Sequence, residues 1–169
     1  MECRIDSLSM VEIIVPNVHS FLRRAFFTCC TGHSNQVRPR NVTDVKVHHS
    51  VEVIEQKTFE GCEWLAVVDL GKGLRVIRRR AVAYCLSLEH FVVPPTARAI
   101  NARAFEYCSQ LTSVQLCEGL EKIGKDAFRG CTNLRAVMIP SSVTVIDTDA
   151  FDNSTQLKTT KLWGWRYNY

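Results

Sequence analysis

The residues of this sequence best able to do chemistry are its eight cysteines. Four of them, Cys62, Cys85, Cys108 and Cys131, follow one another at steps of 23 residues. Thiols can bind zinc, but zinc sites are typically built on a C-x-x-C pair, which this sequence lacks. Cysteines at equal spacing point the same way in a stacked structure, which disfavours disulfide geometry. We therefore expect these four to be buried free thiols.

A tighter group of potential metal ligands comprises Cys29, Cys30 and His33, to which Cys3 or His19 could add a fourth ligand. This composition suits zinc. Cys30, however, also belongs to a regular apolar pattern described below, which favours a place in the core. Zinc binding stays open as an alternative, and the main prediction assigns this chain no metal, no cofactor and no catalytic residue.

A third motif is the stretch 119–125, which matches most of the phosphate-loop pattern G-x-x-x-x-G-K. It fails at Asp126, where the magnesium-binding Ser or Thr should stand. Leu120 and Ile123 within it also belong to the regular apolar pattern. The sequence contains no nucleophile elbow and no H-E-x-x-H motif. We therefore predict that the protein is not an enzyme.

The elements that must position these residues repeat every 23 residues. Counting each unit from its first apolar residue, seven columns repeat down the chain, with positions 17 and 18 taken together as one column. Position 1 holds Val42, Leu65, Leu88, Leu111, Leu134 and Leu157; position 4 holds Val45, Val68, Phe91, Val114 and Val137; position 6 holds Val47, Leu70, Val93, Leu116 and Ile139; position 10 holds Val51, Leu74, Ala97, Leu120 and Val143; position 13 holds Ile54, Ile77, Ile100, Ile123 and Ile146; positions 17 and 18 pair a small with a larger residue, as in Ala104-Phe105; position 21 holds the cysteines, with Ser154 in the last unit.

These columns have a structural cause. Apolar residues at positions 4 and 6 show the two-residue period of a strand, and a following Pro or Gly ends it. Positions 10 and 13 predict a second inward-facing segment. The Ala-Phe-x-x-Cys stretch fits a short helical turn. One unit cannot bury these side chains alone, so stacked copies must share one core.

The columns divide the single domain of residues 1–169 into segments. Residues 10–32 read as a degenerate first repeat, and residues 33–41, which are polar and contain Pro39, as an inserted loop. Five regular repeats fill 42–156. Residues 157–169 form a truncated repeat whose alternating Trp163, Trp165, Tyr167 and Tyr169 we expect to cap the open end, although a dimer or partner surface is the alternative.

The columns resemble the BspA-type leucine-rich repeat, L-x-x-V-x-I-P-x-x-V-x-x-I-x-x-x-A-F-x-x-C. Residues 111–133 and 134–156 fit it nearly position for position, and the resemblance covers 10–162. It implies an α/β fold, a right-handed solenoid of about six repeats with a parallel sheet on one face and short helical turns and loops opposite. Family members act in adhesion or recognition. Val82 in place of Phe, Ser154 in place of Cys and the unit cut off after Tyr169 depart from the pattern.

A candidate binding surface lies at positions 3 and 5, whose side chains should project from the sheet. Its mixture of apolar and polar residues suits a protein partner, although scattered surface apolar residues can also be without function. The predicted partner-binding residues are Asp44, Lys46, Val67, Asp69, His90, Val92, Ser113, Gln115, Ala136 and Met138.

A second surface is a predicted basic edge formed by Arg78, Arg79, Arg80 and Arg103. Acidic residues replace these cations further along the chain, so the edge should be dipolar. It could steer an acidic partner, or it could simply be a solvated face.

Composition narrows the function. The 21 Lys and Arg against 17 Asp and Glu give a net charge of +4, too even to indicate nucleic-acid binding. No apolar run reaches the roughly 18 residues of a membrane span, and the first residues lack the layout of a secretory signal. We therefore predict an intracellular, cytoplasmic, non-catalytic protein-binding module. The alternative is a secreted or cell-surface adhesin, for which the glycosylation sequons at Asn41 and Asn153 would matter.

Overall fold

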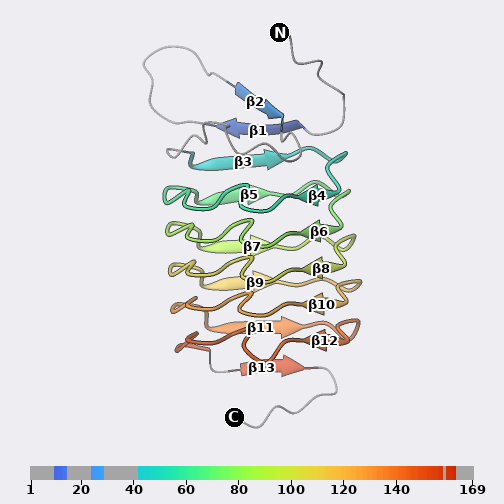
Figure 1. The fold of residues 1–169 in the computed structure, drawn as a ribbon, viewed down its shortest axis with the longest axis vertical. Coiled ribbons are helices and arrows are strands. Elements are labelled where there is room, and N and C mark those ends of the chain that lie inside the picture. Colours follow the sequence, from blue (N-terminus) through green and yellow to red (C-terminus); the bar gives the residue numbers. More distant parts are fainter. Residues whose placement is uncertain (1–9, 15–23, 29–41, 158, 163–169) are drawn as a thin grey trace.

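The computed structural model describes residues 10–14, 24–28, 42–157 and 159–162, and these residues form a stack of short β-strands without a helix (Figure 1). The strands are β1 (Met10–Ile14), β2 (Arg24–Thr28), β3 (Asp44–Val47), β4 (Val53–Ile54), β5 (Val67–Asp69), β6 (Val76–Ile77), β7 (His90–Val92), β8 (Ala99–Ile100), β9 (Ser113–Gln115), β10 (Lys122–Ile123), β11 (Ala136–Ile139), β12 (Val145–Ile146) and β13 (Thr159–Leu162).

Two parallel strips run along the stack. The first, called here the strand sheet, contains β3 paired with β5 and the series β7, β9, β11 and β13, while the second joins β4, β6, β8, β10 and β12. Every paired residue in these strips lies 23 positions from its partner, as in Asp44↔Val67 and Ala136↔Thr159. One turn of the solenoid is therefore one 23-residue unit, as the columns predict.

The apolar columns fill the interior. Leu65, Leu88, Leu111 and Leu134 at position 1 are completely buried. The position-18 phenylalanines stack, with ring centroids 5.1 Å apart for Phe105 and Phe128 and 5.2 Å apart for Phe128 and Phe151. Each such side chain is worth about 1.5–3 kcal/mol on burial, so the shared core holds the units together.

The predicted helical turns are absent among the described residues, and the fold class is all-β rather than α/β. The Ala-Phe-x-x-Cys stretches are runs of turns, here called the turn layer. In the third unit, Arg103 (φ 60°) and Tyr107 (φ 58°) adopt left-handed backbone on either side of Ala104-Phe105. A right-handed helix cannot pass through residues of this conformation. Backbone groups bond to the next unit instead: the Phe105 N–H donates to the Ala127 carbonyl at 2.8 Å.

The left-handed residues recur at two positions of the unit. They are Lys57, Arg80, Arg103 and Asp126 at position 16, and Gly61, Tyr84, Tyr107, Gly130 and Asn153 at position 20. The interruption of the helix is thus a property of the repeat rather than of one unit.

The N-terminal end departs from the parallel stack. A repeat at residues 10–32 should have placed a parallel strand beside β3, but β1 pairs antiparallel with both β2 and β3. At the other end β13 continues the parallel register of β11. The predicted loop at 33–41 and the aromatic residues Trp163 to Tyr169 lie outside the described residues.

Candidate protein-binding surface

The exposed side of the strand sheet carries two rows of side chains, at positions 3 and 5 of each unit. Strands β5, β7 and β9 share an exposed–buried–exposed pattern, because successive side chains of a strand point to opposite faces. The structure thus brings the predicted binding residues together on one surface, called here the strand face. Asp44 is partly buried, and the exposed members are Lys46, Val67, Asp69, His90, Val92, Ser113, Gln115, Ala136 and Met138.

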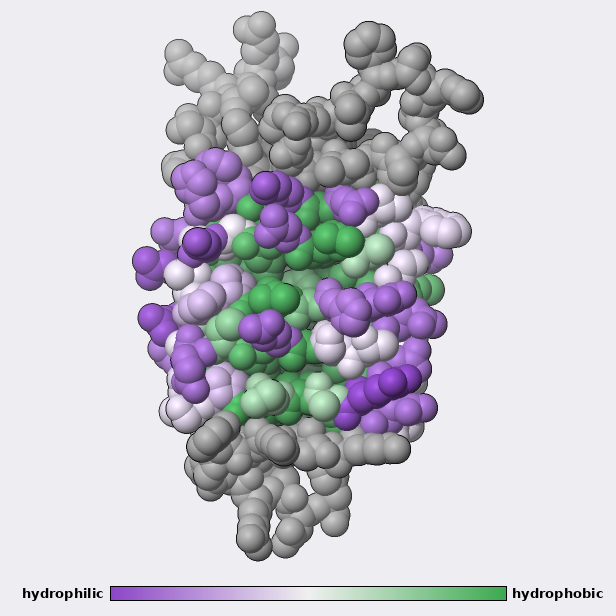
Figure 2. Space-filling model, turned by 180° about the vertical axis from the view of Figure 1, so that it is seen from behind, coloured by the Kyte–Doolittle hydropathy of each residue, from purple (hydrophilic) through white to green (hydrophobic). Residues whose placement is uncertain are grey.

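Apolar side chains lie open on this face. Val67 is 52%, Val92 51% and Met138 61% exposed. Viewed from the side opposite to Figure 1, apolar residues form a band along the stack, with hydrophilic residues among them and on its flanks (Figure 2). Covering such surface yields about 25 cal/mol per Å², so the face gains from contact with an apolar partner.

The His90 ring makes polar contacts with the neighbouring unit on the strand face. Its Nδ1 lies 2.8 Å from the Oγ of Ser113 and 3.3 Å from the Oγ1 of Thr112. These contacts join β7 to β9 and fix the ring in one orientation. The strand face therefore combines solvent-exposed apolar side chains with a histidine whose ring contacts the hydroxyl groups of the next unit.

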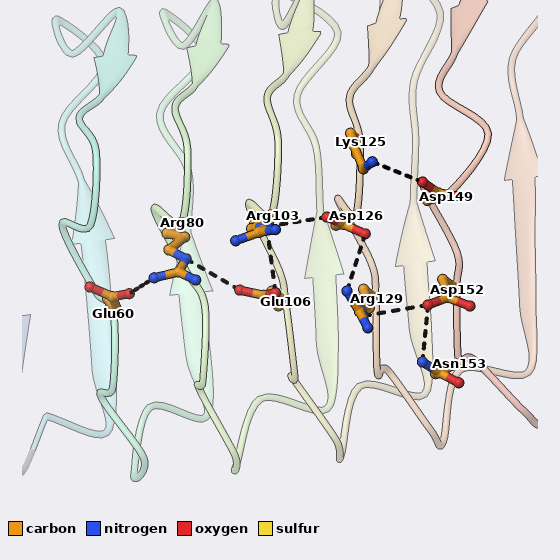
Figure 3. A network of polar contacts seen from close by, with 10 residues as sticks. All are labelled: Glu60, Arg80, Arg103, Glu106, Lys125, Asp126, Arg129, Asp149, Asp152 and Asn153. Atoms are coloured by element: carbon orange, nitrogen blue, oxygen red, sulfur yellow. Dashed lines mark hydrogen bonds and ion pairs between the residues drawn. The ribbon is translucent and has the colours of Figure 1, made fainter.

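A network of ion pairs crosses the turn layer (Figure 3). The Nε of Arg80 lies 3.2 Å from Glu106, and its Nη1 lies 3.6 Å from Glu60. Arg103 donates from Nε to Asp126 at 3.1 Å. The charges alternate in sign along a series of contacts that runs through five units: Glu60, Arg80, Glu106, Arg103, Asp126, Arg129 and Asp152.

The network neutralises much of the predicted basic edge. The side chains of Arg80 and Arg103 are only 26% and 31% exposed, and both face carboxylates. The hydrogen bond to Asp126, with the charge of Glu106, raises the pKa of Arg103 above its ordinary value. Arg78 pairs with Glu55 at 3.4 Å. Arg79 alone of the four is exposed without an acidic partner among the described residues, which leaves little free positive charge at this edge.

The cysteine column consists of buried free thiols, as predicted. Three of these thiols donate to a carbonyl of the preceding unit: Cys85 to Phe59 at 3.2 Å, Cys108 to Val82 at 3.1 Å and Cys131 to Phe105 at 3.2 Å. A hydrogen bond with the thiol of Cys108, together with burial, raises the pKa of Cys85 well above its ordinary value. Thiols held in the neutral form and away from solvent are poor nucleophiles and poor metal ligands.

The other chemical motifs form no site in the described part of the chain. The phosphate-loop-like stretch 119–125 makes a turn and β10, and its Leu120 and Ile123 are buried in the core. Cys29, Cys30 and His33 lie outside the described residues. Within the described ranges no three His, Cys, Asp or Glu side chains gather where a metal could bind. None of these residues belongs to a helix that could cross a bilayer.

Sequence reasoning missed Trp64, whose side chain is 65% exposed in the turn that leads into β5. The signal was available. Trp64 occupies position 23, where the other units carry the polar residues Ser87, Gln110, Asn133 and Gln156. A large aromatic residue in an otherwise polar, exposed column indicates a contact surface.

Parallel strands at a 23-residue step around leucine, isoleucine and phenylalanine columns define a leucine-rich-repeat solenoid. The BspA type leucine rich repeat region matches residues 34–158 in six copies. This match covers most of the chain, and the protein belongs to this family.

Solved structures agree with the fold. A leucine-rich repeat protein of T. pallidum is 26% identical, with a TM-score of 0.66 over 75% of this chain and 67% of that chain. A leucine-rich repeat protein of Bacteroides ovatus ATCC 8483 is 21% identical, with a TM-score of 0.56 over 74% of this chain and 38% of that chain. The chain thus corresponds to about two thirds of the first protein and well under half of the second. Comparison with curated protein sequences gave no match.

Proposed function

We propose that the protein is a non-catalytic interaction module that binds a protein partner through the strand face. The observation that carries this proposal is the row of half-exposed apolar side chains, Val67, Val92 and Met138, set among polar residues on a sheet. Protein interfaces have apolar centres and polar rims. The backbone that carries these side chains is already ordered in the sheet, so binding requires no ordering of a loop, which favours affinity.

Family membership supports the same role, since BspA-type repeats commonly serve as interaction or surface-adhesion modules. An adhesin would use a surface of this kind outside the cell. Asn153 of one sequon is exposed in the turn layer, where a glycan could be accommodated. Protease treatment of intact cells distinguishes the two roles, because only a surface-displayed protein is digested.

The test of partner binding is photocrosslinking from chosen sites of the full chain in extracts of the source cells. A photoreactive phenylalanine replaces Val92 or Met138 on the strand face, or Arg79 in the turn layer. We expect a discrete crosslinked partner from the first two sites only. Crosslinks from position 79 alone would contradict the proposal.

Affinity capture provides the second arm. The double variant Val92→Glu, Met138→Glu should lose the partner identified by crosslinking. The control is Val145→Glu, which introduces one such charge at an exposed valine of the other strip, and it should be compared with Val92→Glu alone as well as with the double variant. Circular dichroism of each variant verifies that the solenoid is intact. Retention of the partner by the double variant would place the contact elsewhere.

A further inference from the structure

Trp64 is the most exposed large apolar side chain of the described residues. It lies in the turn before β5, and the chain after it is held firmly: the N–H groups of Ala66 and Val67 donate to the Thr43 carbonyl at 2.8 and 3.0 Å. Val67, also exposed, follows on the strand face. Trp64 and Val67 thus form an apolar margin of this face on a fixed backbone.

Three residues with exposed carboxylates neighbour this margin, either along the chain or in the next unit of the stack. Glu63 precedes Trp64, and its carbonyl accepts the N–H of Ser87 at 3.0 Å, which sets the two neighbouring turns side by side. Glu89 follows that second turn, and Asp69 ends β5. We call Trp64, Val67, Glu63, Asp69 and Glu89 the Trp64 patch.

The carboxylates of the Trp64 patch lack lysine or arginine partners in the described part of the chain. Glu89 reaches only the Nε2 of His90, at 4.0 Å. Lys46 is the register partner of Asp69, yet no ion pair joins the two side chains.

Acidic residues of the other strip and the turn layer behave differently. Glu55 pairs with Arg78 at 3.4 Å, and Asp149 pairs with Lys125 at 3.1 Å. The chain as a whole carries a net charge of +4. Lys46 offsets part of the charge of Asp69, but Glu63 and Glu89 leave the Trp64 patch locally negative on a positive protein, and this charge complements a cationic partner.

We propose that the Trp64 patch binds a segment of a partner protein that carries arginine or lysine. This inference rests on the proposed function and narrows it to one partner chemistry. The indole face attracts a guanidinium or ammonium group through a cation–π contact. Carboxylates accept paired hydrogen bonds from arginine, and Val67 covers the apolar stem of the side chain. Tryptophan and arginine are the residue types most often found at energetic centres of interfaces.

Selection from a library of random 12-residue peptides displayed on phage tests the inference with the full chain as bait. We expect the selected peptides to be enriched in arginine and lysine. A selected peptide, labelled for fluorescence anisotropy, should bind Trp64→Ala and the double variant Asp69→Asn, Glu89→Gln at least about tenfold more weakly than wild type. The matched control Glu52→Gln, Glu121→Gln removes the same charge from the other strip and should bind as wild type does. Raising the salt concentration should weaken binding.

The outcomes separate this inference from the proposed function. Acidic or uncharged selected peptides, or no selected peptide at all, would overturn the inference. Peptides that keep their affinity for both Trp64 patch variants but lose it with Val92→Glu, Met138→Glu would overturn the inference and leave the strand face as the binding surface. Peptides that keep their affinity for the Trp64 patch variants and for Val92→Glu, Met138→Glu alike would overturn both.

Discussion

The hydroxyl of Ser154 donates a hydrogen bond to the carbonyl oxygen of Phe128 at 2.9 Å. The thiol of Cys131 makes the equivalent bond to Phe105 at 3.2 Å. The serine that interrupts the cysteine column therefore keeps the interaction that the column provides. Position 21 serves as a buried hydrogen-bond donor to the turn layer, and its sulfur is not essential for that purpose.

This relationship predicts the effect of changing Ser154. Ser154→Ala leaves a buried carbonyl without this donor and should lower the free energy of unfolding by about 1–2 kcal/mol. Ser154→Cys restores the donor of the other units and should stay close to wild type. Urea denaturation followed by circular dichroism measures both. Equal stability of the alanine and wild-type proteins would show that the bond contributes nothing.

The phenylalanine stack predicts a gradient of stability. Phe128 is fully buried between Phe105 and Phe151, so Phe128→Ala should cost about 3–5 kcal/mol. Phe151 is only partly buried in the last unit, and Phe151→Ala should cost clearly less. Chemical denaturation of the two variants provides the comparison. A larger loss for Phe151→Ala would mean that the end of the stack is more tightly packed than its middle.

Two glycines of position 20 allow two costs of a Gly→Ala substitution to be separated: the strain of the left-handed backbone and the steric contact of the added Cβ. Both have left-handed backbone, with φ of 75° for Gly61 and 70° for Gly130. A Cβ on Gly61 would meet nothing within 4 Å, whereas one on Gly130 would come within 2.5 Å of the Tyr107 ring. Gly61→Ala should therefore cost about 1 kcal/mol, from the backbone alone.

Gly130→Ala should cost more than Gly61→Ala, by the work needed to displace the Tyr107 ring. In the Tyr107→Ala background the obstacle is removed, and Gly130→Ala should then cost about as much as Gly61→Ala costs in wild type. Thermal and urea denaturation of wild type, the three single variants and the double variant complete the comparison. Equal costs for the two glycine variants would show that the ring moves aside freely.

Thiol reactivity should follow burial. Burial, with the nearby thiol of Cys108, raises the pKa of Cys131 well above its ordinary value, and the side chain is inaccessible. Cys117 is only partly buried. In native protein at pH 8, iodoacetamide should alkylate Cys117 well before Cys85 or Cys131, as measured by peptide mass spectrometry over time. In urea the difference should vanish. Early alkylation of the column in native protein would contradict the packed core.

The hydrogen bonds to the Glu118 carboxylate predict that the free energy of unfolding depends on pH. The N–H of Ser141 donates to its carboxylate at 3.1 Å and that of Ser142 at 3.2 Å, and these bonds, the Ser141 N–H foremost, lower the pKa of Glu118. A lowered pKa stabilises the fold above the unfolded-state value, about 4.3, and that contribution is lost as pH falls through the folded-state pKa. Glu118→Gln should thus be less stable than wild type at pH 7, and the difference should shrink as the pH falls below about 4.3, in urea titrations at each pH. A stability difference independent of pH would exclude this linkage.

Much of the architecture can be predicted because it depends on periodicity. The isoleucines of position 13 recur at every step, and Ile54, Ile77, Ile100 and Ile123 are all buried. The two-residue period of a strand fixes which side chains face outward once the apolar ones face inward, so the strand face follows from the sequence alone.

The turn layer could not be predicted in the same way. Arg80 and Tyr84 are ordinary side chains, and nothing in their type indicates the left-handed backbone that they adopt. Gly61, Gly130 and Asn153, in the same column as Tyr84, are the only hint. Because the sequence does not indicate that conformation, it does not show that side chains at positions 16 and 19 of neighbouring units face each other. The arginines therefore read as a free basic edge rather than as members of ion pairs.

The alternating charges of the turn layer have a consequence for how the chain finds its register. The core columns of successive units are nearly interchangeable, so a slip of one whole unit during folding would still bury leucine on leucine. The ion pairs are not interchangeable. A slip of one unit that brought Glu106 into the place of Arg129 would set it against Asp152, the present partner of Arg129, and replace attraction by repulsion. The ion pairs thus distinguish units whose core residues are nearly the same. They destabilise the out-of-register forms that the repetitive core alone would tolerate.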